Sequence, residues 1–95
     1  MSKPRYAWWG YIRKILWRYP DGLTNGEREA IEYAIEQTRR MQDGAERMAL
    51  IEMVFFRKTH TLGGAALALH CEYETAKRRQ QQFIRMVGQK RGLMS

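Results

Sequence analysis

The chain has 95 residues, of which 44% are hydrophobic and 12% aromatic, and it carries a net charge of +7. This apolar content excludes a disordered chain, and the length suits one small domain with one modest core. Helix-forming residues dominate and strand-like runs of Val, Thr and Ile are absent. We therefore expect one all-α domain of about five helices over residues 1–95.

The charge is concentrated at the two ends of the chain. Residues 1–20 contain five basic and no acidic residues, residues 21–56 contain four basic and eight acidic residues, and residues 57–95 contain eight basic and two acidic residues. A strongly basic protein attracts polyanions, and counterion release favours their binding. Composition alone leaves nucleic-acid binding and a merely solvated basic surface equally open.

Cysteine usage and apolar patterning bear on the compartment. Cys71 is the only cysteine, so no internal disulfide can form, which fits a reducing cytoplasm. No apolar run approaches the roughly 20 residues that cross a bilayer. The charged, tryptophan-containing N-terminus has no uninterrupted apolar core, so we expect neither a signal peptide nor a membrane partner.

The first expected helix runs from about Tyr6 to Tyr19, because Pro20 disfavours helical geometry in the residue before it. Trp9 and Trp17 lie away from its main apolar stripe and are candidates for a partner surface. The stripe consists of Trp8, Tyr11, Ile12, Ile15, Leu16 and Tyr19, and the opposite face carries Arg13, Lys14 and Arg18.

The next two helices are expected to begin at polar caps. Thr24 and Glu27 have the spacing of a capping box, and Asp43 is the expected N-cap of the third helix, which continues through Phe56. The short connection between them predicts antiparallel packing. The expected buried residues are Ile31, Ala34, Ile35, Thr38 and Met41 in the second helix, and Leu50, Ile51, Val54 and Phe55 in the third.

The last two helices are expected to form a helix-turn-helix over residues 58–95, supported by residues 1–57. Thr61 caps a short helix with Leu62, Ala65, Ala66 and Leu69 facing inward. After a turn at residues 70–72, the fifth helix runs from about Tyr73 to Arg91 and is ended by Gly92.

The fifth helix has the pattern of a DNA-recognition helix, in which the second helix of the motif enters the major groove. Ala76, Phe83 and Val87 face back, whereas basic and amide side chains face out and suit base edges and phosphates. The alternative is a surface hairpin with a solvated basic face. The candidate DNA-binding residues are Tyr73, Glu74, Thr75, Lys77 and Arg78 for base edges, and Gln81, Gln82 and Arg85 for the backbone.

The segment Thr61–Val87 resembles the helix-turn-helix of sigma factor region 4, without a gap. The matching positions are Thr61-Leu62, Ala65-Ala66, the turn Leu69-His70-Cys71 and the helix start Tyr73-Glu74-Thr75-Ala76. Three positions depart from that pattern. His70 replaces the turn glycine and must adopt left-handed geometry, Glu72 replaces a serine cap, and Arg79 occupies a usually apolar position from which it could snorkel or reach a phosphate.

Most of the chain resembles the small phage regulators of the RinA/ArpU type. The shared features are an aromatic first helix ending at Tyr19-Pro20, an acidic middle helix and the stretch Leu50-Ile51-Glu52-Met53-Val54. This resemblance implies transcriptional activation of phage or prophage late genes through promoter DNA, with RNA polymerase as a further candidate partner. Because a region 4-like unit binds DNA weakly alone, we expect a homodimer through the aromatic first helix.

Other chemistry is not expected, so we expect neither an enzyme nor a cofactor. His60, His70 and Cys71 lack a fourth ligand and do not have the spacing of a metal site. We expect Cys71 to be a buried turn residue rather than a thiol switch. Gly63-Gly64 lacks the remainder of a phosphate-binding loop. Two other functions stay open: a small terminase-like DNA-packaging subunit, and a helical adaptor that binds proteins through its first helix.

Overall fold

The computed structural model describes residues 8–92, which form five α-helices and one π-helical segment and contain no strand. The predicted all-α class is therefore confirmed. Within this range, no helix is both long and apolar enough to cross a membrane. The elements are α1 (Trp8–Arg18), α2 (Asn25–Arg39), α3 (Gly44–Ile51), the π-helical η1 (Glu52–Phe56), α4 (Leu62–Ala68) and α5 (Tyr73–Lys90).

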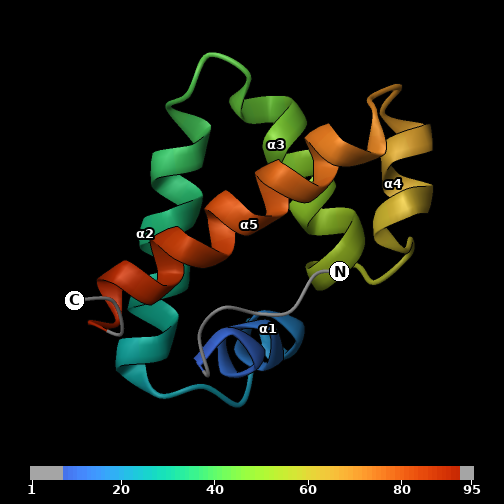
Figure 1. Ribbon diagram of the computed structural model, residues 1–95. Coiled ribbons are helices and arrows are strands. Elements are labelled where there is room, and N and C mark those ends of the chain that lie inside the picture. The colour runs from blue at the N-terminus through green and yellow to red at the C-terminus, as the bar shows by residue number, and fades with distance from the viewer. Residues whose placement is uncertain (1–7, 93–95) are drawn as a thin grey trace.

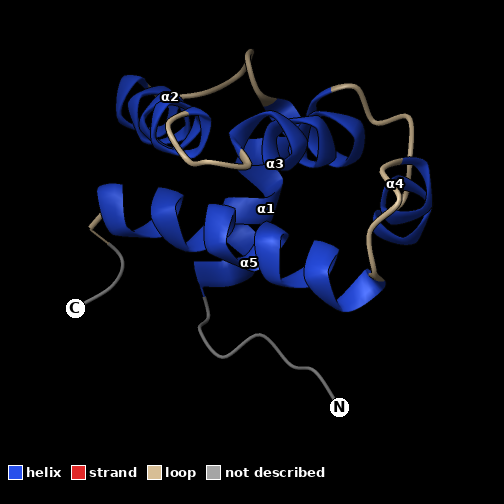
Figure 2. Ribbon diagram, turned by 90° about the horizontal axis from the view of Figure 1, so that it is seen from above, coloured by secondary structure: helices blue, strands red, loops and turns tan. Residues whose placement is uncertain are grey.

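The longest helix, α5, lies across the other helices (Figure 1). Seen from above, α5 occupies one side of the molecule, α2 and α3 the other, and α4 one end (Figure 2). The helices α2 and α3 run in opposite directions, as their short connection predicts (Figure 1). The core between the elements contains Ile12 and Leu16 of α1, Ile31 of α2, Ile51 of α3, Phe55 of η1, and Phe83 and Ile84 of α5.

The start of α2 confirms the predicted capping box. The Glu27 amide donates to the Thr24 hydroxyl oxygen at 3.2 Å, and the Thr24 amide donates to Oε1 of Glu27 at 3.0 Å. Helix α1 ends at Arg18, one residue before the predicted end, and its predicted start at Tyr6 lies outside the described residues. Its buried residues belong to the predicted apolar stripe.

The third helix differs from the expectation in two details. Asp43 is the N-cap residue, as predicted, but it makes no side-chain capping bond, because its carboxylate accepts a hydrogen bond at 2.8 Å from Nε of Arg47 instead. The helix is also not α-helical throughout, since it changes to π-helical geometry in η1, where the Arg57 amide donates to the Glu52 carbonyl. Val54 and Phe55 are nevertheless buried, so the apolar stripe was predicted correctly although the backbone hydrogen bonding was not.

The connection from α4 to α5 is a tight turn with the predicted local geometry. The Thr61 hydroxyl accepts a hydrogen bond from the Gly64 amide at 3.1 Å, which caps α4. His70 has the left-handed geometry expected of it, with a φ of 56°. Glu72 precedes α5 without a side-chain capping bond, and α5 ends at Lys90, one residue earlier than predicted, before Gly92 at a φ of 76°.

Candidate nucleic-acid interface

The buried face of α5 fixes how the helix lies on the molecule. Ala76, Phe83 and Val87 are buried, as predicted, and Gln80 is buried on the same face. Gly88 is also buried, and a Cβ atom there would lie 2.6 Å from the indole ring of Trp8. A glycine at this position therefore lets the C-terminal half of α5 approach α1 closely.

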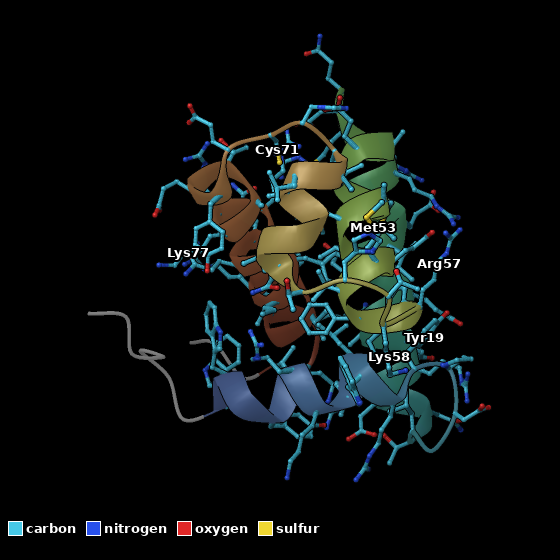
Figure 3. The ribbon with its side chains drawn as sticks, turned by 90° about the vertical axis from the view of Figure 1, so that its right-hand side faces the viewer. Tyr19, Met53, Arg57, Lys58, Cys71 and Lys77 are labelled. Carbon is cyan, nitrogen blue, oxygen red and sulfur yellow. The ribbon has the colours of Figure 1, made fainter. Side chains whose placement is uncertain are left out.

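The opposite face of α5 carries exposed polar and charged side chains. Glu74, Arg78 and Arg85 are exposed and follow each other at intervals of four and seven residues, so they form one stripe. The two arginines lie about 10 Å apart along the helix axis. Lys77 and Gln81 are half-buried beside this stripe, and Figure 3 shows Lys77 pointing away from the other helices.

The start of α5 holds the remaining predicted base-reading residues. Tyr73 is 52% exposed, whereas Thr75 is half-buried. Leu67, in the preceding helix α4, is 80% exposed. The N-terminal end of α5 therefore presents an aromatic side chain together with acidic and basic ones.

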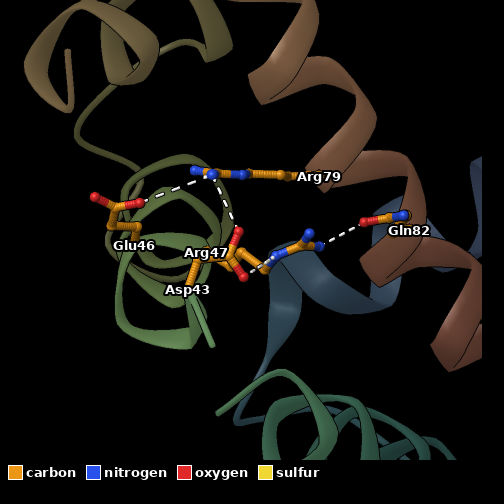
Figure 4. Close-up of polar contacts among 5 residues, drawn as sticks. All are labelled: Asp43, Glu46, Arg47, Arg79 and Gln82. Carbon is orange, nitrogen blue, oxygen red and sulfur yellow. Dashed lines mark hydrogen bonds and ion pairs between the residues drawn. The ribbon is translucent and has the colours of Figure 1, made fainter. Parts of the chain in front are cut away.

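Gln82 does not face outward as the sequence predicts. Its side-chain oxygen accepts a hydrogen bond from the Arg47 guanidinium, and Gln82 is half-buried (Figure 4). Arg47 lies on α3, 35 residues away in the sequence, so the pattern of α5 alone could not reveal this contact. This bond uses the side-chain oxygen of Gln82 and not its side-chain amide nitrogen.

Arg79 joins the same polar cluster. Its guanidinium nitrogen lies 3.1 Å from Oδ2 of Asp43 and 3.7 Å from Oε1 of Glu46, and its side chain is only 16% exposed (Figure 4). The hydrogen bond from Arg47, and then the charges of Arg47 and Arg79, hold the pKa of Asp43 below its ordinary value. Arg79 is therefore largely buried and pairs with acidic side chains rather than extending into solvent, and it ties α5 to the start of α3.

The polar cluster helps to fix the orientation of the exposed stripe of α5. One side of α5 is connected to α3 by polar contacts among Asp43, Arg47, Arg79 and Gln82. The apolar face packs α5 against the core. Two kinds of contact on two sides of the helix restrict its rotation about its own axis. The exposed arginines therefore project from a helix whose orientation is set by its neighbours, as a preorganised binding surface requires.

The other candidate groups do not form a chemical site among residues 8–92. No group of three or more His, Cys, Asp or Glu side chains in that range is placed to hold a metal ion. Cys71 is half-buried and packs against the core, which makes it less buried than the sequence suggests. Of the two tryptophans proposed for a partner surface, Trp17 is 51% exposed, whereas Trp9 packs partly against the core.

Comparison with known proteins adds no relative to this description. No protein-family model, curated protein sequence or solved structure matches the chain.

Proposed function

We propose that this protein binds double-stranded DNA in a sequence-dependent manner, with α5 as the helix that enters the major groove. The observation that carries the proposal is the exposed stripe of α5, which places Arg78 and Arg85 on a helix held by the core and by the polar cluster. A short capped helix and a tight turn precede this helix, which suits the helix-turn-helix arrangement.

The exposed residues can be given separate roles in this proposal. Residues near the start of a recognition helix reach deepest into the groove, so Tyr73, Glu74, Lys77 and Arg78 would contact base edges. An arginine can bind guanine through two hydrogen bonds, and a glutamate can accept one from cytosine. Gln81 and Arg85 would contact the DNA backbone, whereas Gln82 contributes less because its side-chain oxygen is bonded to Arg47. Thr75, which is half-buried like Lys77, stays a candidate for base edges.

The regulatory part of the proposal rests on the resemblance to small phage regulators. On that basis we propose that the protein controls transcription of phage or prophage late genes, with RNA polymerase as a further partner. A terminase-like packaging subunit would use the same DNA-binding helix but would assemble into a ring. The mass of the DNA complex distinguishes these two functions.

The test is selection of bound sequences from a random duplex pool at about physiological salt, which suppresses non-specific binding. We expect an enriched motif. The Arg78→Ala variant should bind that motif about 10-fold more weakly, because a base-contacting arginine contributes about 1–3 kcal/mol. Arg40→Ala, which removes another exposed charge at the end of α2, should leave DNA affinity within about twofold.

Two results would contradict the proposal. Equal effects of Arg78→Ala and Arg40→Ala would show that α5 does not read the DNA. The absence of any salt-sensitive DNA binding would favour the helical adaptor, and tight binding without an enriched motif would favour packaging.

A further inference from the structure

A second surface lies on α1, apart from the exposed stripe of α5. A hollow of about 520 Å³ is formed where α1 meets η1. We call this hollow the basic groove; it is lined by Gly10, Arg13, Lys14, Trp17 and Arg18 of α1 and by two largely buried residues of η1, Val54 and Phe55, which we call its floor. The floor is apolar, and the three cationic side chains are exposed.

The charge of the basic groove is uncompensated by its own lining. No acidic residue lines it, and the described helix α1 contains no acidic residue. Lys58 adds a further cation beside it, because its ammonium nitrogen lies 5.1 Å from the centroid of the Trp17 ring. The groove therefore combines an apolar floor with a rim of positive charge, which is complementary to an anionic, amphipathic ligand.

The position of Lys58 is unusual for a lysine. It has a left-handed backbone with a φ of 58°, a geometry that glycine adopts more readily. The amides of Thr59 and His60 both donate to the Met53 carbonyl, which closes the end of η1 around this residue. Figure 3 shows Lys58 beside α1, where this backbone places its ammonium group over Trp17.

We propose that the basic groove docks an acidic, amphipathic segment of another protein. Carboxylates of the segment would pair with Lys14, Arg18 and Lys58, and one aliphatic or aromatic side chain would pack against Trp17, which is 51% exposed. An amphipathic peptide in an apolar groove is a common recognition mode, and the surrounding charges select the acidic partner. This site is separate from the proposed DNA-reading residues and does not depend on them.

The ring contacts favour a peptide over a single-stranded nucleic acid. Nucleic acids bind such grooves by stacking bases on open aromatic faces. Here the Arg13 guanidinium carbon lies 5.7 Å from the Phe55 ring centroid, and Lys58 lies over the Trp17 ring. A cation therefore already lies over each ring where a base would stack, which makes the groove less suited to a single-stranded nucleic acid than to an acidic peptide.

Charge also disfavours a second copy of this helix as the occupant. In a two-fold dimer through α1, the two copies contribute the same surface of the helix to the interface. Arg13, Lys14 and Arg18 would then face the same basic surface on the other copy. An acidic partner neutralises these charges, whereas a copy of α1 doubles them.

The experiment uses the full chain and a fluorescein-labelled peptide of 12 residues in which Asp and Glu alternate with Leu and Phe. Anisotropy measures its affinity at low salt, and amide chemical shifts locate its binding site. We expect saturable binding, with the largest shifts in α1 and η1. A control peptide with Asn and Gln in place of the acids should bind at least about 10-fold more weakly.

Charge reversal gives the matched test of the site. The double variant Lys14→Glu with Arg18→Glu should weaken peptide binding by about 10-fold or more, since both side chains are exposed and lie on the groove wall. The control, Arg39→Glu with Arg40→Glu, makes the same change of charge at two exposed positions outside the groove and should leave peptide binding within about twofold. Circular dichroism of each variant checks that its helices are intact.

Three results would overturn the proposal. The first is peptide-induced shifts confined to residues away from α1, η1 and Lys58, and the second is unchanged affinity in the double variant. The third is binding of single-stranded oligo-dT in the basic groove without binding of the acidic peptide, which would assign the groove to a nucleic acid.

Discussion

Among single residues, Glu27 links the start of α2 to α1. One carboxylate oxygen accepts the Thr24 amide, and the other accepts the Tyr11 hydroxyl at 2.6 Å. The hydrogen bond from Tyr11 is the largest cause of a pKa below the ordinary value of 4.5 for this carboxyl. The same contact adds to the effect of burial in raising the pKa of Tyr11. Glu27 therefore takes part in capping α2 and also holds α2 to α1.

These pKa shifts predict how stability depends on pH. A carboxyl whose pKa is lower in the folded state contributes stability above its unfolded pKa, and this contribution is lost as the pH falls through the folded pKa. Glu27 and Asp43 shift in this direction, so the melting temperature should fall as the pH decreases below about 4.5. Glu27→Gln should destabilise the protein by about 1 kcal/mol at pH 7 and reduce the acid-induced decline.

Thermal unfolding followed by circular dichroism between pH 7 and pH 3 measures this effect. Glu36→Gln is the matched control, because Glu36 is exposed and pairs only with its own helix through Arg40. It should change the unfolding free energy at pH 7 by less than about 0.5 kcal/mol. If Glu27→Gln behaves like this control, the contact between Tyr11 and Glu27 does not contribute to stability.

At the scale of elements, the junction between α2 and α3 depends on Gly44. A Cβ atom there would lie 2.5 Å from the Thr38 carbonyl oxygen and 2.7 Å from that of Arg39. These are backbone atoms, so relief requires movement of the end of α2. Gly44→Ala should therefore destabilise the protein by about 2 kcal/mol.

The matched comparison is Gly10 on α1, where an added Cβ would meet no atom within 4 Å. Gly10→Ala should stabilise the protein by about 0.5 kcal/mol, because alanine has a higher helix propensity than glycine. Urea denaturation of both variants measures the difference. Equal changes in the unfolding free energy for the two substitutions would mean that the end of α2 and the start of α3 do not approach as closely at Gly44 as the structure shows.

For the whole molecule, the distribution of charge bears on self-association. The sequence predicts a homodimer through the aromatic first helix, and this stays a prediction. In the described structure, the exposed side of that helix carries Arg13, Lys14 and Arg18 around the half-exposed Trp17. A dimer through this side must bring like charges together, so added salt should strengthen it.

Light scattering at micromolar concentration and at two salt concentrations tests this expectation against the 11.3 kDa mass of the chain. A dimer through α1 should have twice this mass at high salt and dissociate at low salt. A dimer that weakens with added salt must use another surface. A stable dimer whose interface buries Trp17 would exclude the proposed docking of an acidic segment.

Features that depend on local interactions follow from the amino-acid sequence alone. The caps at Thr24 and Thr61, the left-handed turn at His70 and the buried stripe of α5 each arise within a few residues of the chain. Helical periodicity also placed Arg78 and Arg85 on the exposed face of α5. These features suffice for the all-α class, whereas the role of Arg78 and Arg85 in reading DNA stays a prediction.

Which polar side chains turn away from solvent depends on how the helices pack in the tertiary structure. Asp43 and Arg79 are 36 residues apart in the sequence, and the two form an ion pair only because α3 packs beside α5. The same packing turns Gln82 toward Arg47, and the meeting of α1 with η1 forms the basic groove. Periodicity along one helix cannot identify such contacts, because a charged side chain can satisfy its hydrogen bonds with water or with a distant partner.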